Sequence, residues 1–207
     1  MTFQEAVDGV KIGHFVRKGG KIRGVVHVGA NDGEEIPFYL ALGAKKVLAF
    51  EPNLDAWANC ISRWNYPEIT VLPIGLGSIC GVAYLIVTEG DGKGSSFLLE
   101  KHTPYEVVGH KAAPLMTFRQ LNIDLTPYNT LVIDVQGMEW QVLVGFREFL
   151  SRFDFVSVEC SRVPLFHGEK SAQEIIDYLS VFDFIQDSPI EDHNDIMFIR
   201  KGVTFPE

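Results

Sequence analysis

Short apolar runs alternate with segments of helical spacing along most of this 207-residue chain. Each run is short enough for a buried strand, and each is followed by a turn or by a segment with apolar residues on one helical face. Strands that alternate with helices favour a mostly parallel sheet covered on both faces, and two consecutive strands at the end of the chain favour an antiparallel edge. The predicted strands are residues 25–28, 47–50, 69–74, 82–88, 131–135, 155–159, 184–190 and 196–200, and the predicted helices are 34–42, 54–64, 118–121, 139–150 and 171–182.

The chain shows no internal repeat and no linker, and 46% of its residues are hydrophobic. This composition and length predict one domain over residues 1–207, with residues 1–24 as an N-terminal extension. Residues 89–116 are rich in Gly, Ser, Lys and Pro and have no clear period, which predicts a long lid-like loop.

The formal net charge of -9 argues against nucleic acid or an anionic membrane surface as the main partner, because both bind clustered Lys and Arg. No apolar stretch reaches the ~20 residues that span a bilayer, and the first residues carry acids rather than a signal-peptide core. Cys60, Cys80 and Cys160 are far apart and form no C-x-x-C pair. We therefore expect reduced thiols, no metal site and a cytoplasmic protein.

Small and acidic residues follow the first two predicted strands, in "VVHVGANDGEE" and "VLAFEPN". In open parallel sheets, ligands bind at the carboxyl ends of the strands. A glycine at position 29 allows a sharp turn and the close approach of a ligand, and Glu51 can accept hydrogen bonds from a ribose diol. The pattern therefore predicts a nucleoside site. Its candidate residues are Gly29, Ala30, Asn31, Asp32 and Gly33 in the first turn, and Glu51, Pro52 and Asn53 in the second.

The first turn reads G-A-N-D-G rather than G-x-G-x-x-G, the pattern that packs closely on a pyrophosphate. Asp32 would also repel a pyrophosphate. A ligand with a ribose, an ammonium group and a sulfonium suits this turn better, and S-adenosylmethionine has all three.

Four segments together resemble the FkbM-type S-adenosylmethionine-dependent methyltransferases: "VVHVGANDGEE", "VLAFEPN", "GKGSSF" and "LVIDVQGMEWQVLVGF". The resemblance extends from about residue 25 to residue 200. It implies a class I methyltransferase (Rossmann-like) fold, doubly wound, with a mostly parallel seven-stranded sheet and an antiparallel last strand. It also implies S-adenosylmethionine as cofactor and O-methylation of a hydroxyl group on a small molecule or glycan. The chain departs from the family pattern at His27, where an acid is common, and at Val132, where a lysine is common.

Two carboxyl groups at strand ends, Asp134 and Glu159, are the candidate catalytic residues. A charged group at the end of a buried strand is costly unless it has a partner or a task. Asp134 could instead cap the next helix or contact the amino group of the cofactor. The remaining candidate cofactor residues are His27 on the pocket floor, Gly75 and Leu76 near adenine by the family pattern, and Ser95 and Ser96 in a lid.

Two other functions fit the same pattern less well. A nicotinamide-dependent oxidoreductase would need a pyrophosphate turn and a Tyr/Lys proton relay, and the chain contains no Y-x-x-x-K. A non-catalytic nucleoside-binding or partner protein could retain the pocket without methyl transfer.

Overall fold

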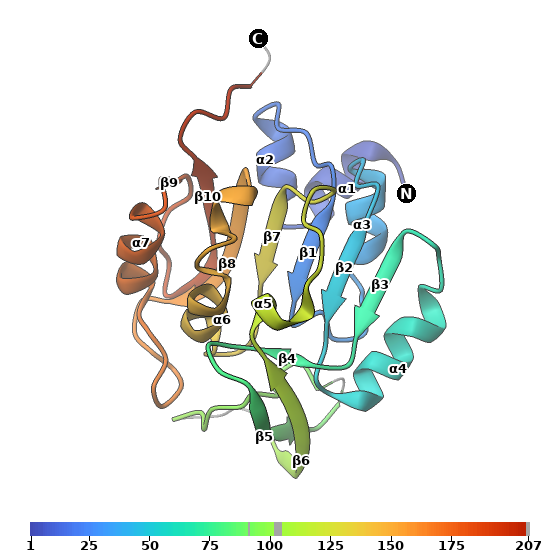
Figure 1. Ribbon diagram of the computed structural model, residues 1–207, viewed down its shortest axis with the longest axis vertical. Helices are drawn as coiled ribbons and strands as arrows, with labels where there is room; N and C mark the ends of the chain where they lie inside the picture. Colours follow the sequence, from blue (N-terminus) through green and yellow to red (C-terminus); the bar gives the residue numbers. More distant parts are fainter. Residues whose placement is uncertain (91, 102–104, 206–207) are drawn as a thin grey trace.

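A seven-stranded sheet with strand order β3-β2-β1-β7-β8-β10-β9 forms the centre of the molecule (Figure 1). The computed structural model describes residues 1–90, 92–101 and 105–205. β1, β2, β3, β7 and β8 are parallel, whereas β10 is antiparallel to both β8 and β9. The predicted class I methyltransferase fold is confirmed. The strands are β1 (Val25–Val28), β2 (Val47–Phe50), β3 (Ile69–Leu72), β7 (Thr130–Ile133), β8 (Phe155–Ser161), β9 (Phe184–Gln186) and β10 (His193–Arg200).

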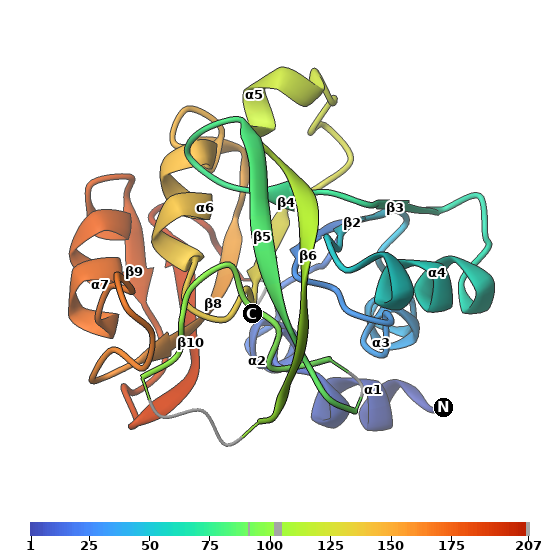
Figure 2. The same ribbon diagram turned by 90° about the horizontal axis from the view of Figure 1, so that it is seen from below.

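The central strands are apolar because both of their faces are covered. All four residues of β1, of β2 and of β7 are buried. One hydrophobic cluster joins one sheet face to α5 (Phe118–Leu121), α6 (Glu139–Phe146) and α7 (Ala172–Ser180). A second joins the other face to α1 (Phe3–Gly9), α2 (Gly13–Arg17), α3 (Ile36–Ala41) and α4 (Leu54–Arg63). Figure 2 shows α5 and α6 on one side of the sheet and α1 and α3 on the other.

A second sheet of three strands lies at the carboxyl ends of the parallel strands (Figure 1). It contains β4 (Gly75–Leu76), β6 (Val107–Met116) and β5 (Gly81–Thr88), in that order. The prediction of a loop over residues 89–116 is therefore wrong for its last ten residues. Their alternation of buried and exposed positions was obscured by Gly109 and by Pro114, which sits where β6 pairs with β5 alone.

α4 packs through small side chains, and α6 is shorter than predicted. In α4 the buried residues are Ala56 and Cys60, whereas Leu54 is 54% exposed. The small side chains bring this helix close to the sheet. α6 ends at Phe146 instead of residue 150, and a short 3₁₀ helix, Leu150–Arg152, follows it. In α7 the predicted capping box between Ser171 and Glu174 is present.

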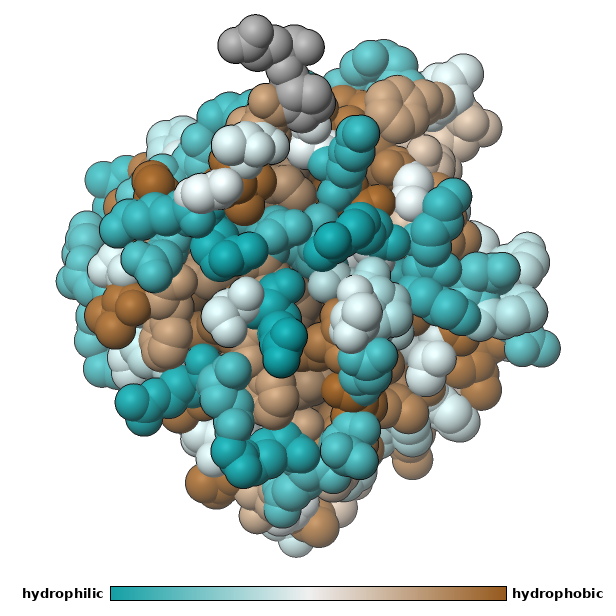
Figure 3. All heavy atoms as spheres, turned by 45° about the horizontal axis from the view of Figure 1, so that its top comes forward, coloured by the Kyte–Doolittle hydropathy of each residue, from teal (hydrophilic) through white to brown (hydrophobic). Residues whose placement is uncertain are grey.

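The surface that is seen when the top of Figure 1 is turned forward is mixed in character. Figure 3 shows hydrophilic side chains spread over this side of the molecule, with hydrophobic ones scattered among them. Among the described helices, none is long and apolar enough to cross a membrane.

Candidate functional site

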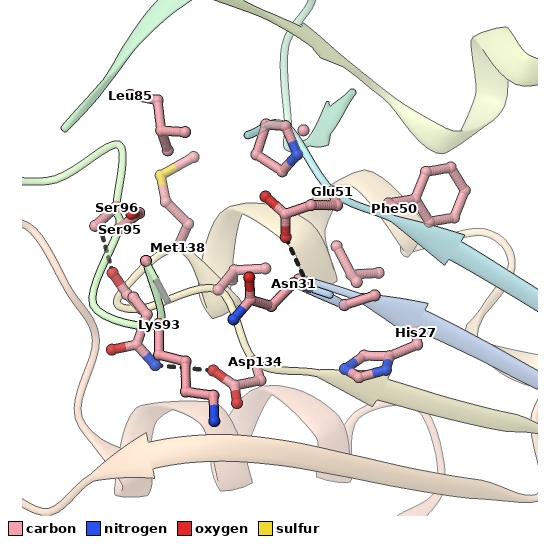
Figure 4. A pocket seen from close by; sticks show the side chains of 18 of the residues that line it. His27, Asn31, Phe50, Glu51, Leu85, Lys93, Ser95, Ser96, Asp134 and Met138 are labelled. Carbon is pink, nitrogen blue, oxygen red and sulfur yellow. Dashed lines mark hydrogen bonds between the residues drawn. The ribbon is translucent and has the colours of Figure 1, made fainter. Parts of the chain in front are cut away.

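A cavity of about 420 Å³ opens where the parallel strands β1, β2, β7 and β8 end. The second sheet and residues 92–97 cover it from the opposite side. Figure 4 shows His27, Asn31, Glu51 and Asp134 around this space. Most of the predicted site residues line it: His27, Gly29, Ala30, Asn31, Asp32, Glu51, Pro52, Gly75, Leu76, Ser95, Ser96, Asp134 and Glu159. Gly33 and Asn53 are not among its lining residues.

Glu51 is a buried carboxylate that two backbone amides hold in place. Asn31 N donates to Oε2 at 2.8 Å and Asn53 N donates to Oε1 at 2.7 Å. Burial raises the pKa of Glu51 to about 7, although the two amides act to lower it. Each carboxylate oxygen has one amide partner and can accept a further hydrogen bond, so the group can bind two neighbouring hydroxyls. Asn53 itself caps α4 by accepting from Asp55 N.

The two glycines of the first turn serve the packing of the protein. Gly29 has a φ of +87°, and a Cβ there would lie 1.7 Å from the carbonyl oxygen of Asp134. We expected this glycine to give a ligand access to the turn. The structure shows a further reason, because the backbone after β7 leaves no space for a side chain at position 29. Gly33 has a φ of +78°, and a Cβ there would meet Cys60 Sγ at 2.6 Å. Its role is to let α4 approach the turn, which explains why it is not at the cavity.

Asn31 and Asp32 carry buried polar atoms at the cavity. Asn31 has a φ of +46°, and its side-chain Nδ2 has no hydrogen-bond partner among the described residues. Asp32 forms an ion pair with Arg63 through Oδ2, and its Oδ1 is buried without a partner in the same part of the chain. Asn31 thus offers a donor to a ligand, while Arg63 offsets the charge of Asp32.

His27 lies on the cavity floor with hydrogen-bonded neighbours, as predicted. Its Nδ1 is 3.2 Å from the hydroxyl of Tyr39, which donates to Glu35 Oε2 at 2.6 Å. Burial lowers the pKa of His27 despite the nearby carboxylate of Glu35, so the neutral imidazole is favoured. This histidine occupies the strand position where the family often has an acid.

A chain of polar side chains crosses the other end of the cavity. Gln136 Nε2 donates to Asp134 Oδ1 at 2.8 Å and to Glu159 Oε2 at 2.6 Å. On the far side of Glu159, its Oε1 is 3.3 Å from His193 Nε2. The sequence indicated Asp134 and Glu159 as candidates, but it did not indicate that Gln136 joins them or that His193 completes the group.

The carboxyl groups of Asp134 and Glu159 differ in their tendency to hold a proton. Burial raises the pKa of Asp134 well above its usual range, and the nearby Glu159 adds to the rise. Burial also acts to raise the pKa of Glu159, but hydrogen bonds from His193 and Asp134 outweigh it and lower that pKa. These opposite shifts favour the proton on Asp134 and the negative charge on Glu159.

Residues 92–97 pack over the cavity through their serines. Ser95 Oγ accepts from Thr88 N at 3.2 Å, and Ser96 Oγ donates to the carbonyl of Gln136 at 2.6 Å. Lys93 Nζ is 3.0 Å from Glu34 Oε2, across the mouth. The segment is thus bonded to β5, to the turn after β7 and to the turn after β1. Of the predicted lid, residues 91 and 102–104 lie outside the described ones.

An apolar wall faces Glu51 across the cavity. Leu76 is 3% exposed, and a Cβ on Gly75 would meet the ring of Phe97 at 2.8 Å. Figure 4 shows Leu85 and Met138 on this side of the cavity. The sequence prediction missed Leu85, Phe97 and Met138, because these residues come from β5, the lid segment and the turn before α6 and have no pattern that links them.

The chain is similar to known methyltransferases. A family model described as methyltransferase FkbM domain matches residues 27–186, which is more than half of the chain. The 2-O-methyltransferase NoeI of Sinorhizobium fredii is 23% identical over 188 residues, covering 84% of this chain and 77% of that protein.

Two solved structures share the fold. The crystal structure of methyltransferase FkbM from Methylobacillus flagellatus has a TM-score of 0.54 at 15% identity and covers 86% of this chain. This chain spans only 43% of that one. Magnesium protoporphyrin IX methyltransferase from Synechocystis, solved with bound S-adenosylmethionine, has a TM-score of 0.52 at 12% identity, covering 96% of this chain and 79% of its own.

Proposed function

Because the chain belongs to the FkbM methyltransferase family, we propose that it methylates a hydroxyl oxygen of a small molecule or glycan. It is an S-adenosylmethionine-dependent methyltransferase with a class I fold. The observation that carries the finer proposal is the placement of Glu51 and of the Asp134–Glu159 pair around one cavity. The first can hold a nucleoside, and the second can receive the proton of an alcohol.

The residues around Glu51 fit the nucleoside part of S-adenosylmethionine. The Glu51 carboxylate has one free acceptor position on each oxygen for the two ribose hydroxyls. Leu76 and Leu85 line the apolar wall of the cavity, which suits the faces of an adenine ring. Asn31 Nδ2, a buried donor without a partner among the described residues, suits the carboxylate of the methionine part.

The other end of the cavity suits an alcohol. S-adenosylmethionine supplies an activated methyl group on a sulfonium, and the protein supplies binding and orientation. An acceptor hydroxyl beside Asp134 and Glu159 can donate its hydrogen bond to the negative charge that the pair carries. Residues 92–97 cover part of the cavity, which limits the access of water to the reacting groups.

The nature of the acceptor is supported by a relative. The similar protein from Sinorhizobium fredii is named a 2-O-methyltransferase, which indicates a hydroxyl group as the methyl acceptor. A polyhydroxylated acceptor also agrees with the polar side chains Lys93, Gln136 and His193 at this end of the cavity.

Transfer of a ¹³C-labelled methyl group tests this proposal. The purified protein is incubated with ¹³C-methyl S-adenosylmethionine and a panel of methyl hexosides, 6-deoxyhexosides and polyketide alcohols, and products are read by NMR. We expect a new O-methyl signal with at least one acceptor. Asp134→Asn should lower kcat by on the order of 10²-fold with nearly unchanged cofactor affinity, whereas the exposed Asp177→Asn should not.

Binding of S-adenosylmethionine without transfer to any hydroxyl in the panel would contradict O-methylation of these acceptor classes. Binding of NAD in place of S-adenosylmethionine would contradict the cofactor.

A further inference from the structure

The polar chain at the acceptor end of the cavity continues to the protein surface through a histidine that the sequence did not single out. Glu159 Oε1 lies 3.3 Å from His193 Nε2, and the other ring nitrogen, Nδ1, lies 3.0 Å from Ser161 Oγ. The Glu159 side chain is 18% exposed and that of His193 is 42% exposed. Side chains in hydrogen-bond reach of one another therefore connect the buried Asp134 to solvent.

The register of the sheet produces this connection. β10 is antiparallel to β8, and His193 pairs with Ser161, two residues beyond Glu159. The imidazole thus lies over the end of β8, at the rim of the cavity that Asp134, Gln136 and Glu159 line. Ser161 is buried and fixes the ring from its other side.

An acceptor hydroxyl that loses its proton at this site needs a final proton acceptor. Asp134 already holds a proton, and Glu159 accepts hydrogen bonds from Gln136 and is paired with His193, which makes its carboxylate a weak base. A proton delivered to this pair therefore has to leave it again before the next turnover.

We propose that His193 relays the proton of the acceptor hydroxyl from the Asp134–Glu159 pair to solvent during methyl transfer. This inference rests on the proposed O-methyltransferase function. His193 acts through Glu159, so it is a relay and positioning residue.

The acceptor oxygen forms its bond to the methyl group, and the electron pair of the broken carbon–sulfur bond stays on sulfur. The hydroxyl proton goes to Asp134, while the proton that Asp134 held passes to Glu159, to which Asp134 donates a hydrogen bond. Glu159 then gives one proton to His193 Nε2, while Nδ1–H donates to Ser161 Oγ. The charged ring has an acceptor at each nitrogen, and because its side chain is 42% exposed, a ring nitrogen can then release the proton to water.

Nearby carboxyl groups stabilise the charged form of the ring. The hydrogen bond with Glu159 on β8 raises the pKa of His193 and burial opposes the rise, while Glu169 adds to it, as does Glu139 once it is ionised. Glu169 precedes α7 and Glu139 begins α6. Only the neutral ring can take up a proton, so kcat should rise with pH through a pKa above the ordinary histidine value of ~6.5.

The first test needs no acceptor. The ring of His193 is titrated by NMR in the wild type and in Glu159→Gln, with its signal assigned from the spectrum of His193→Gln. We expect a pKa above ~6.5 in the wild type that falls toward that value in Glu159→Gln. The same pKa in both proteins would show that the ring is not coupled to the pair and would overturn the relay.

The second test measures kcat against pH for transfer from ¹³C-methyl S-adenosylmethionine to the panel of methyl hexosides and 6-deoxyhexosides. His193→Gln should lose the rising limb and lower kcat by roughly tenfold to hundredfold, with unchanged affinity for S-adenosylmethionine. His110→Gln, at an exposed position on β6, should keep the wild-type profile. A retained limb in His193→Gln would overturn the relay. If the wild type methylates no panel member, the acceptor class proposed above fails, and the NMR titration still decides whether His193 is coupled to the pair.

Discussion

Asp134 and Glu159, at the ends of adjacent parallel strands, share one hydrogen-bond donor. Gln136 Nε2 lies 2.8 Å from Asp134 Oδ1 and 2.6 Å from Glu159 Oε2. Since Asp134 holds a proton and Glu159 is ionised, the pair presents a single negative charge to the cavity. A single charge suits a site where a sulfonium and an alcohol meet, because it can balance the cation and then accept one proton.

Replacement of Gln136 tests the importance of this shared donor. Gln136→Leu leaves both carboxyl groups without their common partner, which costs about 1–3 kcal/mol for buried polar groups. We expect kcat to fall roughly tenfold to hundredfold, with the affinity for S-adenosylmethionine changed little, because Glu51 is untouched. Gln173→Leu on the exposed face of α7 is the matched control. Equal kcat values for the two variants would exclude a role for the shared donor in turnover.

Cofactor affinity should depend on pH through Glu51. Its pKa of about 7 in the free protein means that about half of the molecules carry a protonated carboxyl at that pH. Only the carboxylate can accept from both ribose hydroxyls, so the affinity for S-adenosylmethionine should rise between pH 6 and pH 8, by up to about tenfold per pH unit below 7. Calorimetric titrations at pH 6, 7 and 8 measure this, and Glu51→Gln should bind weakly at all three. An equally steep dependence in Glu51→Gln would assign it to another group.

Glu139 gives a prediction about stability. It is buried at the start of α6, where its Oε1 accepts from Val135 N and Gly137 N at 3.1 Å each, and burial raises its pKa to about 8. The folded protein therefore binds a proton here that the unfolded chain releases above pH ~4.5, so this group lowers the free energy of unfolding as pH rises from ~4.5 to about 8.

Glu139→Gln keeps the acceptor oxygen for both amides and removes the titration. We expect it to raise the free energy of unfolding at pH 9 by about 2 kcal/mol or more relative to wild type, and to have little effect at pH 4.5. Urea unfolding at pH 4.5, 7 and 9 measures the difference. A difference that does not change with pH would show that Glu139 is ionised in the folded protein.

Substitution of two glycines with almost the same φ distinguishes the cost of backbone strain from the cost of a steric clash. Gly29 and Gly202 have φ values of +87° and +86°, but a Cβ at position 29 would lie 1.7 Å from Asp134 O, whereas a Cβ at position 202 would meet no atom within 4 Å among the described residues beyond its chain neighbours. Gly202→Ala should cost only about 1–2 kcal/mol of backbone strain. Gly29→Ala should cost at least about 2 kcal/mol more, because the turns after β1 and β7 must separate. Urea unfolding of both variants measures the loss in the free energy of unfolding. Equal losses would show that the backbone after β7 can move away from position 29 without a loss of stability.

The sequence predicted the main sheet well because its central strands are buried on both faces. Apolar runs such as 25–28 and 47–50 can be recognised without knowledge of their neighbours, and the polar residues that follow them mark the carboxyl edge where Glu51 and Asp134 line the cavity. The family resemblance supported the same assignment. Most of the predicted site residues line the cavity, whereas Gly33 faces α4 and Asn53 caps it.

The remaining features depend on contacts between distant segments. His193 reaches Glu159 only through the antiparallel register of β10 on β8, which a hairpin of different length would change. β6 was missed because Gly109 and Pro114 interrupt its alternation, although it pairs with β5 along its length. In α4, the burial of Cys60 instead of Leu54 follows from the close approach of the helix to Gly33. None of these contacts has a local signal in the sequence.

Calorimetric titration with S-adenosylmethionine, in the wild type, Glu51→Ala and the exposed Glu68→Ala, tests the central assignment of the cavity most directly. We expect binding in the micromolar range to the wild type and to Glu68→Ala. We expect a loss of at least about tenfold in Glu51→Ala, since two charge-assisted hydrogen bonds are removed. Equal affinity in all three proteins would contradict a nucleoside site at Glu51, because S-adenosylmethionine would then bind without the carboxylate around which the cavity is built.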